Sequence, residues 1–480
     1  MGAAPRCVIF RATLVFLMCQ GCTVGPDYIR PDPAAPDAWR RKAVRGLRTA
    51  GADLQTWWRR LDDPLLNDLI ERTRQANFDV KQALARVMQS RSLRAIAAGE
   101  RVPDIDAVGS YTRARISEGI LPPATGGLKR TENFYTAGGI ASWEIDLWGR
   151  IRRNVESADY SLEAAFEDLR DVLVVLYADV AINYVQVRTL QARIQFAEEN
   201  VKRQEATLVL TADRFKAGLV PQLDVRQAEL NLARTESSIP RLKQTLKQTA
   251  HRLEVLSGQN PGTLYEELSE IRPIPKPPDD IGVGVPADLI RQRPDIRSAE
   301  RRLAAQTAQI GVATALLYPQ FTLFGDFLFE SARGSLSGIF RAGNISWSYG
   351  PSFSWNIFDG DRIRSNIRFE EAVADEAYFD YRQTVLEALE DVENSMVAYV
   401  RECDRRDKLH DSVVAAKESV DLVTTLYRTG LVDFQNVLDM ERSLFEQQDE
   451  FVSSRGTVTT NLINIYRALG GGGPSQQELM

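Results

Sequence analysis

Two long stretches of the chain contain neither glycine nor proline, and this feature limits what the chain can fold into. The first is Ile151–Ala217 and the second is Asp361–Thr429. Glycine and proline are the residues that most often interrupt a helix, so each stretch predicts one continuous helix. A helix of about 65 residues is roughly 100 Å long, several times the length of an ordinary globular helix. No compact domain can bury such an element, so we expect the chain to span a gap or to form a tube.

The long stretch occurs twice because most of the chain is duplicated. The two copies end on similar segments, Phe215–Val220 and Tyr427–Val432, each with glycine in the fourth position. Further upstream, Asn77–Ala83 corresponds to Arg293–Ala299. The length of the chain alone would suggest several domains, but repeats of this size indicate one architecture built twice. We expect each copy to contain a helix, two strands, a long helix and a further helix.

The expected boundaries follow from this duplication. We expect a signal peptide at 1–21, an N-terminal lipidated segment at 22–63, the first repeat at 64–258, a proline-rich linker at 259–286, the second repeat at 287–470 and a tail at 471–480. In the first repeat we expect strands at about 105–117 and 133–147 and the long helix at about 150–214. In the second we expect strands at about 320–331 and 343–357 and the long helix at about 361–427.

The N-terminus indicates export from the cytoplasm. Arg6 and Arg11 flank a short apolar run, residues 12–18, which is too short to span a bilayer and is typical of a secretory signal. It leads to Gly21-Cys22, and a cysteine directly after a small residue suits a bacterial lipoprotein cleavage site. We therefore expect Cys22 to carry lipid.

Two observations bear on this lipid anchor. The position three before Cys22, usually aliphatic in lipoproteins, is Cys19, and ordinary cleavage nearby is the alternative. Cleavage before Cys22 leaves Cys403 as its one companion, so a lipidated Cys22 excludes a disulfide within the chain.

Composition argues against a transmembrane helix and against binding of nucleic acid. Beyond the signal we find no apolar run near 18 residues and expect no transmembrane helix. The formal net charge is −6, and acidic and basic residues mix along the long helices, which argues against nucleic acid. If the protein enters a membrane it must do so through β-strands, because backbone groups in lipid need hydrogen-bond partners.

Four segments alternate apolar and polar residues, as strands with one apolar and one wet face do. They are Ile345–Ile357, which is the clearest, Phe321–Glu330, Ile105–Thr112 and Tyr135–Leu147. Such segments with aromatic residues near their ends fit an outer-membrane barrel, while a soluble sandwich with one buried face is the alternative. The smallest membrane barrels have about eight strands, so four strands require several copies of the chain to close one.

These segments carry a family resemblance. The chain resembles the TolC-type outer-membrane efflux proteins, specifically the lipoprotein (OprM/NodT-like) branch that serves resistance–nodulation–division pumps. The matching segments are Cys22–Pro31, Trp143–Arg150, Val285–Arg297, Leu426–Gly430 and Arg467–Gly471. The resemblance implies a mainly α fold with a membrane β-barrel: a homotrimer with a twelve-stranded barrel in the outer membrane, a long α-helical barrel through the periplasm and a mixed equatorial collar. It also implies that the segment 22–63 and the equatorial linker 259–286 contribute to the collar, and that the partners are a periplasmic adaptor and an inner-membrane pump.

Residues suited to catalysis are scarce. His251 and His410 lie far apart in helical patterns, and neither is near a cluster with metal-ligand spacing. Gly470–Gly473 follows a helix and is typical of a helix end, not of a phosphate-binding loop. We expect no enzyme, no cofactor and no metal, but a passive exit duct driven by an inner-membrane partner.

Other functions remain as alternatives to a duct. A lipid-anchored periplasmic scaffold without a pore would have no use for Ile345–Ile357, and an envelope enzyme would need a catalytic constellation. Within the duct interpretation, export of drugs, metal ions, other small molecules or polypeptides stays open.

The ends of the long helices are the first candidate site. Glycine there permits the positive φ that reverses the chain. These segments could be turns alone, but we expect both to expose Leu and Val beyond the glycine, at positions where loop residues are usually polar. The resemblance implies that they dock the helical hairpin of the adaptor. The residues are Lys216, Gly218, Leu219, Val220, Arg428, Gly430, Leu431 and Val432.

The second candidate site is a gate that the resemblance implies at Gln435–Arg442. Asp439 is expected to face the lumen and to narrow the periplasmic mouth of a resting, closed channel. Gln435 and Arg442 lie four residues before and three after it, so both can reach it on one helix face. Gln435 stands where relatives often carry an apolar residue, so we expect no hydrophobic plug. A surface Asp–Arg pair worth about 0–1 kcal/mol is the alternative.

Overall fold

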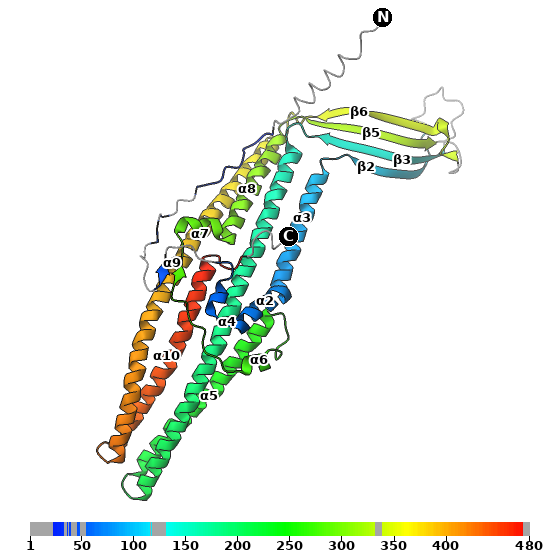
Figure 1. Ribbon diagram of the computed structural model, residues 1–480. Coiled ribbons are helices and arrows are strands. Elements are labelled where there is room, and N and C mark those ends of the chain that lie inside the picture. Colours follow the sequence, from blue (N-terminus) through cyan, green and yellow to red (C-terminus); the bar gives the residue numbers. More distant parts are fainter. Residues whose placement is uncertain are drawn as a thin grey trace. The chain divides into compact units, whose positions relative to one another are not determined.

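The structure, a computed structural model, describes residues 23–32, 36, 38, 39, 46–48, 54–115, 117, 131–331 and 338–473. Cys22 and the signal segment lie outside the described residues. The helices are α2 (Pro64–Ala76), α3 (Phe78–Gly99), α4 (Arg150–Lys216), α5 (Gln222–Leu256), α6 (Tyr265–Ser269), α7 (Pro286–Gln292), α8 (Pro294–Ala315), α9 (Arg362–Arg428) and α10 (Phe434–Ala468), with short 3-10 turns η1 (Trp57–Leu61) and η3 (Ala342–Asn344). The strands are β1 (Leu47–Arg48), β2 (Asp104–Arg115), β3 (Thr131–Ile145), β4 (Ile281–Gly282), β5 (Gln320–Ser331) and β6 (Ile345–Ser354) (Figure 1).

The expected duplication is confirmed by the lengths of the helices. Both α3 and α8 have 22 residues. The long helices α4 and α9 each have 67 residues, and α5 and α10, which follow them, each have 35. Each copy therefore contains a helix, two strands, a long helix and a helix that returns beside it.

The long helices begin and end through the same local chemistry in both copies. The Asp146 carboxylate accepts hydrogen bonds from the first free N–H groups of α4, and Asp359 does the same for α9. At the other end Gly218 and Gly430 adopt φ of 72° and 78°. The N–H after each glycine bonds the carbonyl five residues back, which is the Schellman pattern that ends a helix.

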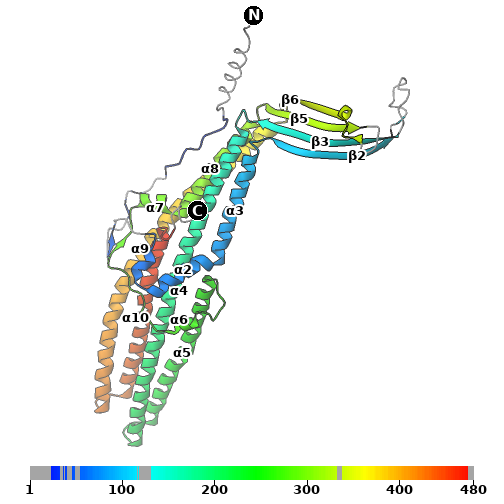
Figure 2. The ribbon, with the colours of Figure 1, turned by 45° about the vertical axis from the view of Figure 1, so that its right-hand side comes forward.

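The chain divides into two compact units. The first comprises Met1–Pro31, Val87–Ala165 and Ala299–Tyr381, and the second comprises Asp32–Arg86, Phe166–Ser298 and Arg382–Met480. The first holds an antiparallel sheet in the order β2-β3-β5-β6 (Figure 2). The outer strands β2 and β6 each pair with one neighbour within the described residues, so the sheet has two open edges.

The register of this sheet confirms the alternation of apolar and polar faces. Directly paired residues share a face, so Phe327 with Trp347 and Phe321 with Phe353 place aromatic rings on one side. The polar pairs Thr322–Ser352 and Asp326–Ser348 lie on the opposite face of the sheet. Trp347, Tyr349 and Phe353 are 65%, 76% and 70% exposed in the single chain. A row of such aromatics without cover marks this face for contact with something other than water.

One strand is shorter than the sequence predicts. The pattern of alternation suggested a strand to about residue 357, but β6 ends at Ser354, so Trp355 and Ile357 lie beyond the sheet. The chain leaves the ladder there to reach Asp359, whose carboxylate caps α9. The hydrophobic alternation continues past the point where backbone pairing stops, which is why the sequence overestimates the strand.

The expectation of no apolar stretch suited to a membrane helix beyond the signal was wrong for α4. This helix contains a window long and apolar enough to cross a bilayer, and 67% of that window is buried inside the chain. Leu173, Tyr177, Ala181 and Tyr184 are among the buried residues of α4. Packing as a core helix of the second unit accounts for its apolar character.

The second unit is built around α4 and α10. Trp57 of η1 stacks on Tyr466 of α10 with ring centroids 5.2 Å apart, and Trp58 packs edge-on against Tyr177 of α4. Asp63 caps α2 and accepts a hydrogen bond of 2.6 Å from the Tyr184 hydroxyl. Strands β1 and β4 pair in parallel, which joins an N-terminal segment to the proline-rich linker. A small mixed layer of helix and strand therefore packs on the long helices.

Candidate functional site

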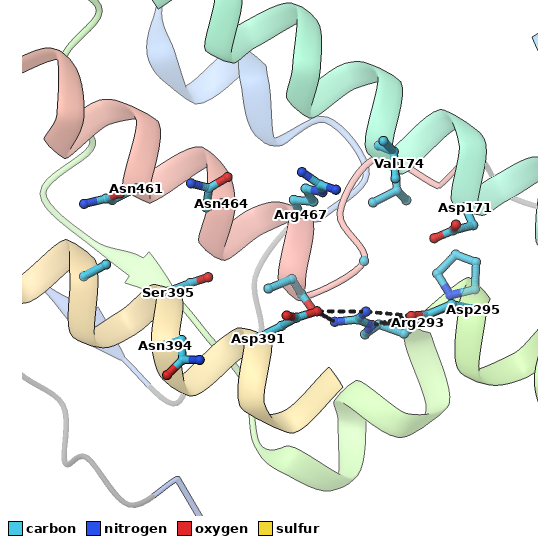
Figure 3. A pocket seen from close by; sticks show the side chains of 15 residues that line it. Asp171, Val174, Arg293, Asp295, Asp391, Asn394, Ser395, Asn461, Asn464 and Arg467 are labelled. Atoms are coloured by element: carbon cyan, nitrogen blue, oxygen red, sulfur yellow. Dashed lines mark hydrogen bonds and ion pairs between the residues drawn. The ribbon is translucent and has the colours of Figure 1, made fainter. Parts of the chain in front are cut away.

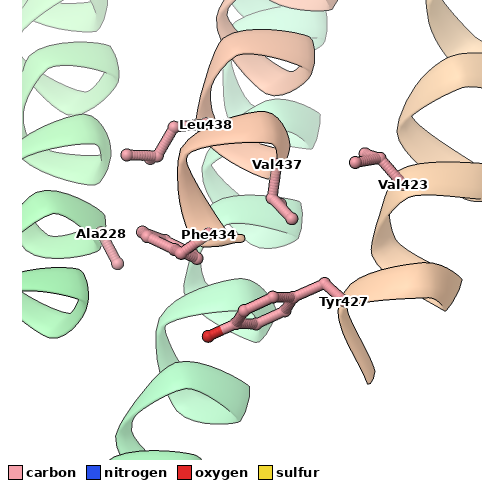
Figure 4. Packing of buried hydrophobic residues seen from close by; sticks show 6 residues of the cluster. All are labelled: Ala228, Val423, Tyr427, Phe434, Val437 and Leu438. Atoms are coloured by element: carbon pink, nitrogen blue, oxygen red, sulfur yellow. The ribbon is translucent and has the colours of Figure 1, made fainter. Parts of the chain in front are cut away.

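The two helix tips present leucine outward and valine inward. Leu219 and Leu431 are 66% and 72% exposed. Val220 and Val432 are half-buried against a cluster that comes from α5, α9 and α10. Its members are Ala228, Val423, Tyr427, Phe434, Val437 and Leu438 (Figure 4). The expectation that both Leu and Val are exposed was therefore wrong for the valines, because they close the apolar core beneath each turn.

The charged residues at the tips lie at the surface. Lys216 is exposed and pairs with Asp213 at 3.1 Å, and Arg428 is also exposed. An exposed pair of this kind contributes little to stability, about 0–1 kcal/mol. These side chains are therefore accessible on the single chain.

Arg214 links the two tips, and no pattern in the sequence pointed to this role. Its Nη1 donates to the carbonyl oxygens of Tyr427 and Arg428, at 2.6 and 2.9 Å. Its guanidinium also lies 4.7 Å from the centre of the Tyr427 ring. The Tyr427 carbonyl also accepts from the Gly430 N–H, so Arg214 adds a second donor there and supplies one to the Arg428 carbonyl. A cation at the carboxyl end of α9 also complements the helix dipole.

The structure brings the three proposed gate residues together on α10. The Gln435 Nε2 donates to Asp439 Oδ1 at 2.8 Å, and Arg442 Nη1 lies 4.0 Å from the same oxygen. The Asp439 side chain is 52% exposed. Arg442 Nε also donates to Asn231 Oδ1 of α5 at 3.2 Å, so the group is anchored to the neighbouring hairpin.

Glu441 lies beside this group but points into the interior, where it is 5% exposed. Thr207 Oγ1 of α4 donates to Glu441 Oε1 at 2.6 Å, and Asn231 Nδ2 of α5 donates to Oε2 at 3.3 Å. Burial raises the pKa of Glu441, against the lowering effects of Thr207, Arg203 and Asn231. One glutamate of the second hairpin therefore contacts both helices of the first.

A polar cavity of about 550 Å³ lies elsewhere in the second unit, beside the end of α10 (Figure 3). Arg293 bridges Asp295, Asp391 and the Ala468 carbonyl there. Burial raises the pKa of Asp171 to about 6, with the nearby Asp295 adding to the rise and Arg293 opposing it. This group ties the end of α10 to the start of α8 and to α9, so we interpret it as a structural junction.

No group of three or more His, Cys, Asp or Glu residues that could hold a metal ion occurs within the part of the chain that the structure describes. The candidate site is therefore a set of helix ends and interhelical contacts. Helix ends can bind a partner protein, and contacts between helices can break and re-form when the helices move apart.

Comparison with known proteins places the chain in a family. The model of the family described as "Outer membrane efflux protein" matches residues 69–259 and 285–471. Nodulation protein T of Rhizobium leguminosarum bv. trifolii is 35% identical over 89% of this chain and 90% of its own length. The solvent efflux pump outer membrane protein SrpC of Pseudomonas putida is 30% identical over 95% of this chain and 96% of its own. The solved outer-membrane channel OprN is 36% identical, with a TM-score of 0.88 over 94% of this chain and 99% of its own.

The chain thus belongs to the outer membrane efflux protein family. The expected resemblance and fold class are confirmed, since the relatives and the solved channel share the duplicated architecture over nearly the whole chain. The family consists of channel proteins. The protein is an outer-membrane channel of a tripartite efflux system, with its location in the outer membrane and a part that extends into the periplasm.

Proposed function

We propose that the chain assembles as a homotrimer and conducts substrates passively to the exterior from a periplasmic adaptor and an inner-membrane resistance–nodulation–division pump. The observation that supports this most is the sheet of the first unit, which has an exposed aromatic face and two open edges. Unpaired backbone groups are costly in lipid, so β2 of one copy pairs with β6 of the next. Three copies of four strands close a twelve-stranded barrel.

The helices give this duct its periplasmic part. At 1.5 Å per residue, a helix of 67 residues extends roughly 100 Å. The tips of α4 and α9 then meet the adaptor, and the pump supplies the energy. The proposal assigns no catalysis, no metal and no cofactor to this chain.

The substrate class is that of the pump which delivers to the duct. The names of the relatives point to different cargoes, such as solvents for SrpC. Drugs, metal ions, other small molecules and polypeptides are therefore all compatible with the channel. The genes next to this one would identify the pump and, with it, the substrate.

Conductance in planar bilayers tests the duct and its gate. We expect the wild type to be mostly closed, because Arg442 compensates the Asp439 carboxylates that converge from three copies. Arg442→Ala should give partial, flickering opening, because the carboxylates then repel one another without compensation, and Arg442→Ala with Asp439→Ala should open less, because that repulsion is gone. Shifting a channel from mostly closed to mostly open requires about 5.5 kcal/mol, which is more than one exposed pair supplies.

Arg226→Ala is the matched control for the gate variants. Arg226 forms an exposed ion pair with Glu229 at 2.7 Å on α5, in the first hairpin. The Arg226→Ala channel should therefore conduct like the wild type. If the Arg442 and Asp439 variants also conduct like the wild type, with assembly confirmed, then the gate lies at other residues.

The lipid anchor is a separate proposal that rests on Gly21-Cys22. Mass spectrometry of the mature N-terminal peptide should show an acylated Cys22. An unmodified peptide that starts at another residue would refute the anchor. Cys22→Ser should mislocalise part of the protein while the channel activity persists, because the strands also hold the assembly in the membrane.

A further inference from the structure

We propose that Glu441, with Thr207 and Asn231, forms a tie between the two hairpins that positions Arg442 and Asp439 and holds the periplasmic end closed. The tie rests on the proposed gate and extends it to residues outside the Gln435, Asp439 and Arg442 group. It joins three helices: α10 supplies the carboxylate, and α4 and α5 supply the donors. Any opening that moves α10 away from the first hairpin must break both hydrogen bonds.

The tie reaches the gate through Asn231. The Asn231 amide donates from Nδ2 to Glu441 and accepts at Oδ1 from Arg442 Nε. Both functions of one buried amide, which is 3% exposed, are therefore used at once. Rotation of this amide would place a donor against the guanidinium, so Glu441 fixes the orientation that Arg442 requires.

The duplicated architecture provides an internal comparison. Glu229 occupies the position in α5 that corresponds to Glu441 in α10, seven residues after the start of each helix. The Glu229 side chain is 44% exposed and pairs with Arg226 on its own helix. The same residue type thus serves as a surface ion-pair partner in one copy and as a buried interhelical contact in the other.

The charge of Glu441 makes the tie sensitive to protonation. Its carboxylate accepts from two neutral donors, the Thr207 hydroxyl of α4 and the Asn231 amide of α5. The charged group that acts on it is Arg203 of α4, which opposes the effect of burial on the pKa of Glu441. Burying an ionised carboxylate without a direct ion pair costs free energy. This cost disappears when the helices separate and water reaches the carboxylate. The proton is therefore bound more tightly in the closed arrangement than in the open one.

The direction of the pH effect follows from this difference. Because burial raises the pKa of Glu441 in the closed arrangement, closure is most stable in acid and loses stability as the pH rises above the ordinary glutamate value of about 4.3. We expect the open probability of the wild type to rise as the pH rises above that ordinary value and to level off above the raised pKa of Glu441. Each unit of difference in pKa between the two arrangements changes the equilibrium up to about tenfold.

Glu441→Gln and Glu441→Ala separate the charge from the contact. Glutamine keeps the shape and can donate to Thr207 while it accepts from Asn231, so it mimics the protonated side chain. It should give a channel that stays closed across the whole pH range. Alanine removes the tie and should give a channel that opens at every pH. Glu229→Gln, the matched control, should keep the pH dependence of the wild type.

Thr207→Val supplies a second test within the same bilayer measurements. The loss of one donor should promote opening in the wild-type background and have no further effect with Glu441→Ala, because the acceptor is gone. A wild-type pH profile in Glu441→Gln, or a closed Glu441→Ala channel in an intact assembly, would overturn the tie. If the wild type and the Arg442 and Asp439 double variant form no channels at all, the duct proposal itself fails.

Discussion

Trp347→Arg is expected to remove most of the assembled protein from the outer membrane, whereas Ser352→Arg is expected to leave assembly intact. Trp347 and Ser352 lie on the same strand, β6, but on opposite faces of the sheet. Trp347 belongs to the exposed aromatic face that we assign to lipid. An arginine on a lipid-facing strand costs from about 1 kcal/mol near the interface to about 2–4 kcal/mol at the bilayer midplane. Trp347 is the third residue of β6, and each copy of a homo-oligomer carries the cost at this position, so the costs add.

The control and the measurement follow from the register. Ser352 pairs with Thr322 on the polar face, so an arginine there is solvated by the lumen and should alter conductance without blocking assembly. Fractionation of outer membranes and electrophoresis without heating would quantify the assembled form. Equal amounts of assembled protein from both variants would show that this sheet does not contact lipid.

Leu219→Glu combined with Leu431→Glu is expected to abolish adaptor binding and efflux while the channel remains assembled. These two leucines are the most exposed apolar side chains at the tips, while Val220 and Val432 pack inward. Truncation of a central interface residue costs about 2 kcal/mol or more, and a buried charge without a partner adds to this loss. The dissociation constant should then rise by at least about 30-fold.

A binding assay with the purified adaptor measures this change, and drug or solvent susceptibility of cells reports the loss of efflux. Lys408→Glu controls for added negative charge, because Lys408 lies on α9 away from the tip and is 85% exposed. Val432→Ala should weaken the turn more than the adaptor contact, since Val432 packs on the apolar cluster. Unchanged adaptor affinity in the double leucine variant would exclude the tips as the docking surface.

The sequence predicted those features that depend on local patterns. The absence of glycine and proline predicts α4 and α9 within two residues at each end, because helix continuity is decided by backbone conformation. Alternation predicts which side of each strand is apolar, because side chains alternate along any extended backbone. It could not predict where β6 leaves the sheet, since that depends on pairing with β5 and on the cap at Asp359.

The interhelical contacts at the candidate site could not be predicted. Thr207 and Glu441 are 234 positions apart in the chain, and their contact depends on how α4 and α10 rotate against each other. Glu441 lies between Asp439 and Arg442 in the sequence, but the helix has many carboxylates and the sequence does not show which of them is buried. Arg214 is equally ordinary in the sequence, and its role comes from the carbonyls at the end of a helix in the other copy.

The matched lengths of the two hairpins restrict how this protein can change in size. Deleting two turns from α4 and α5 alone would shorten the first hairpin by roughly 10 Å and carry Arg214 away from the Tyr427 carbonyl. The same deletion in α9 and α10 would restore the match. A change in the length of the hairpins therefore requires four separate changes in one gene, one in each of the four helices, at positions far apart in its coding sequence. This requirement makes the distance that the helices bridge slow to evolve.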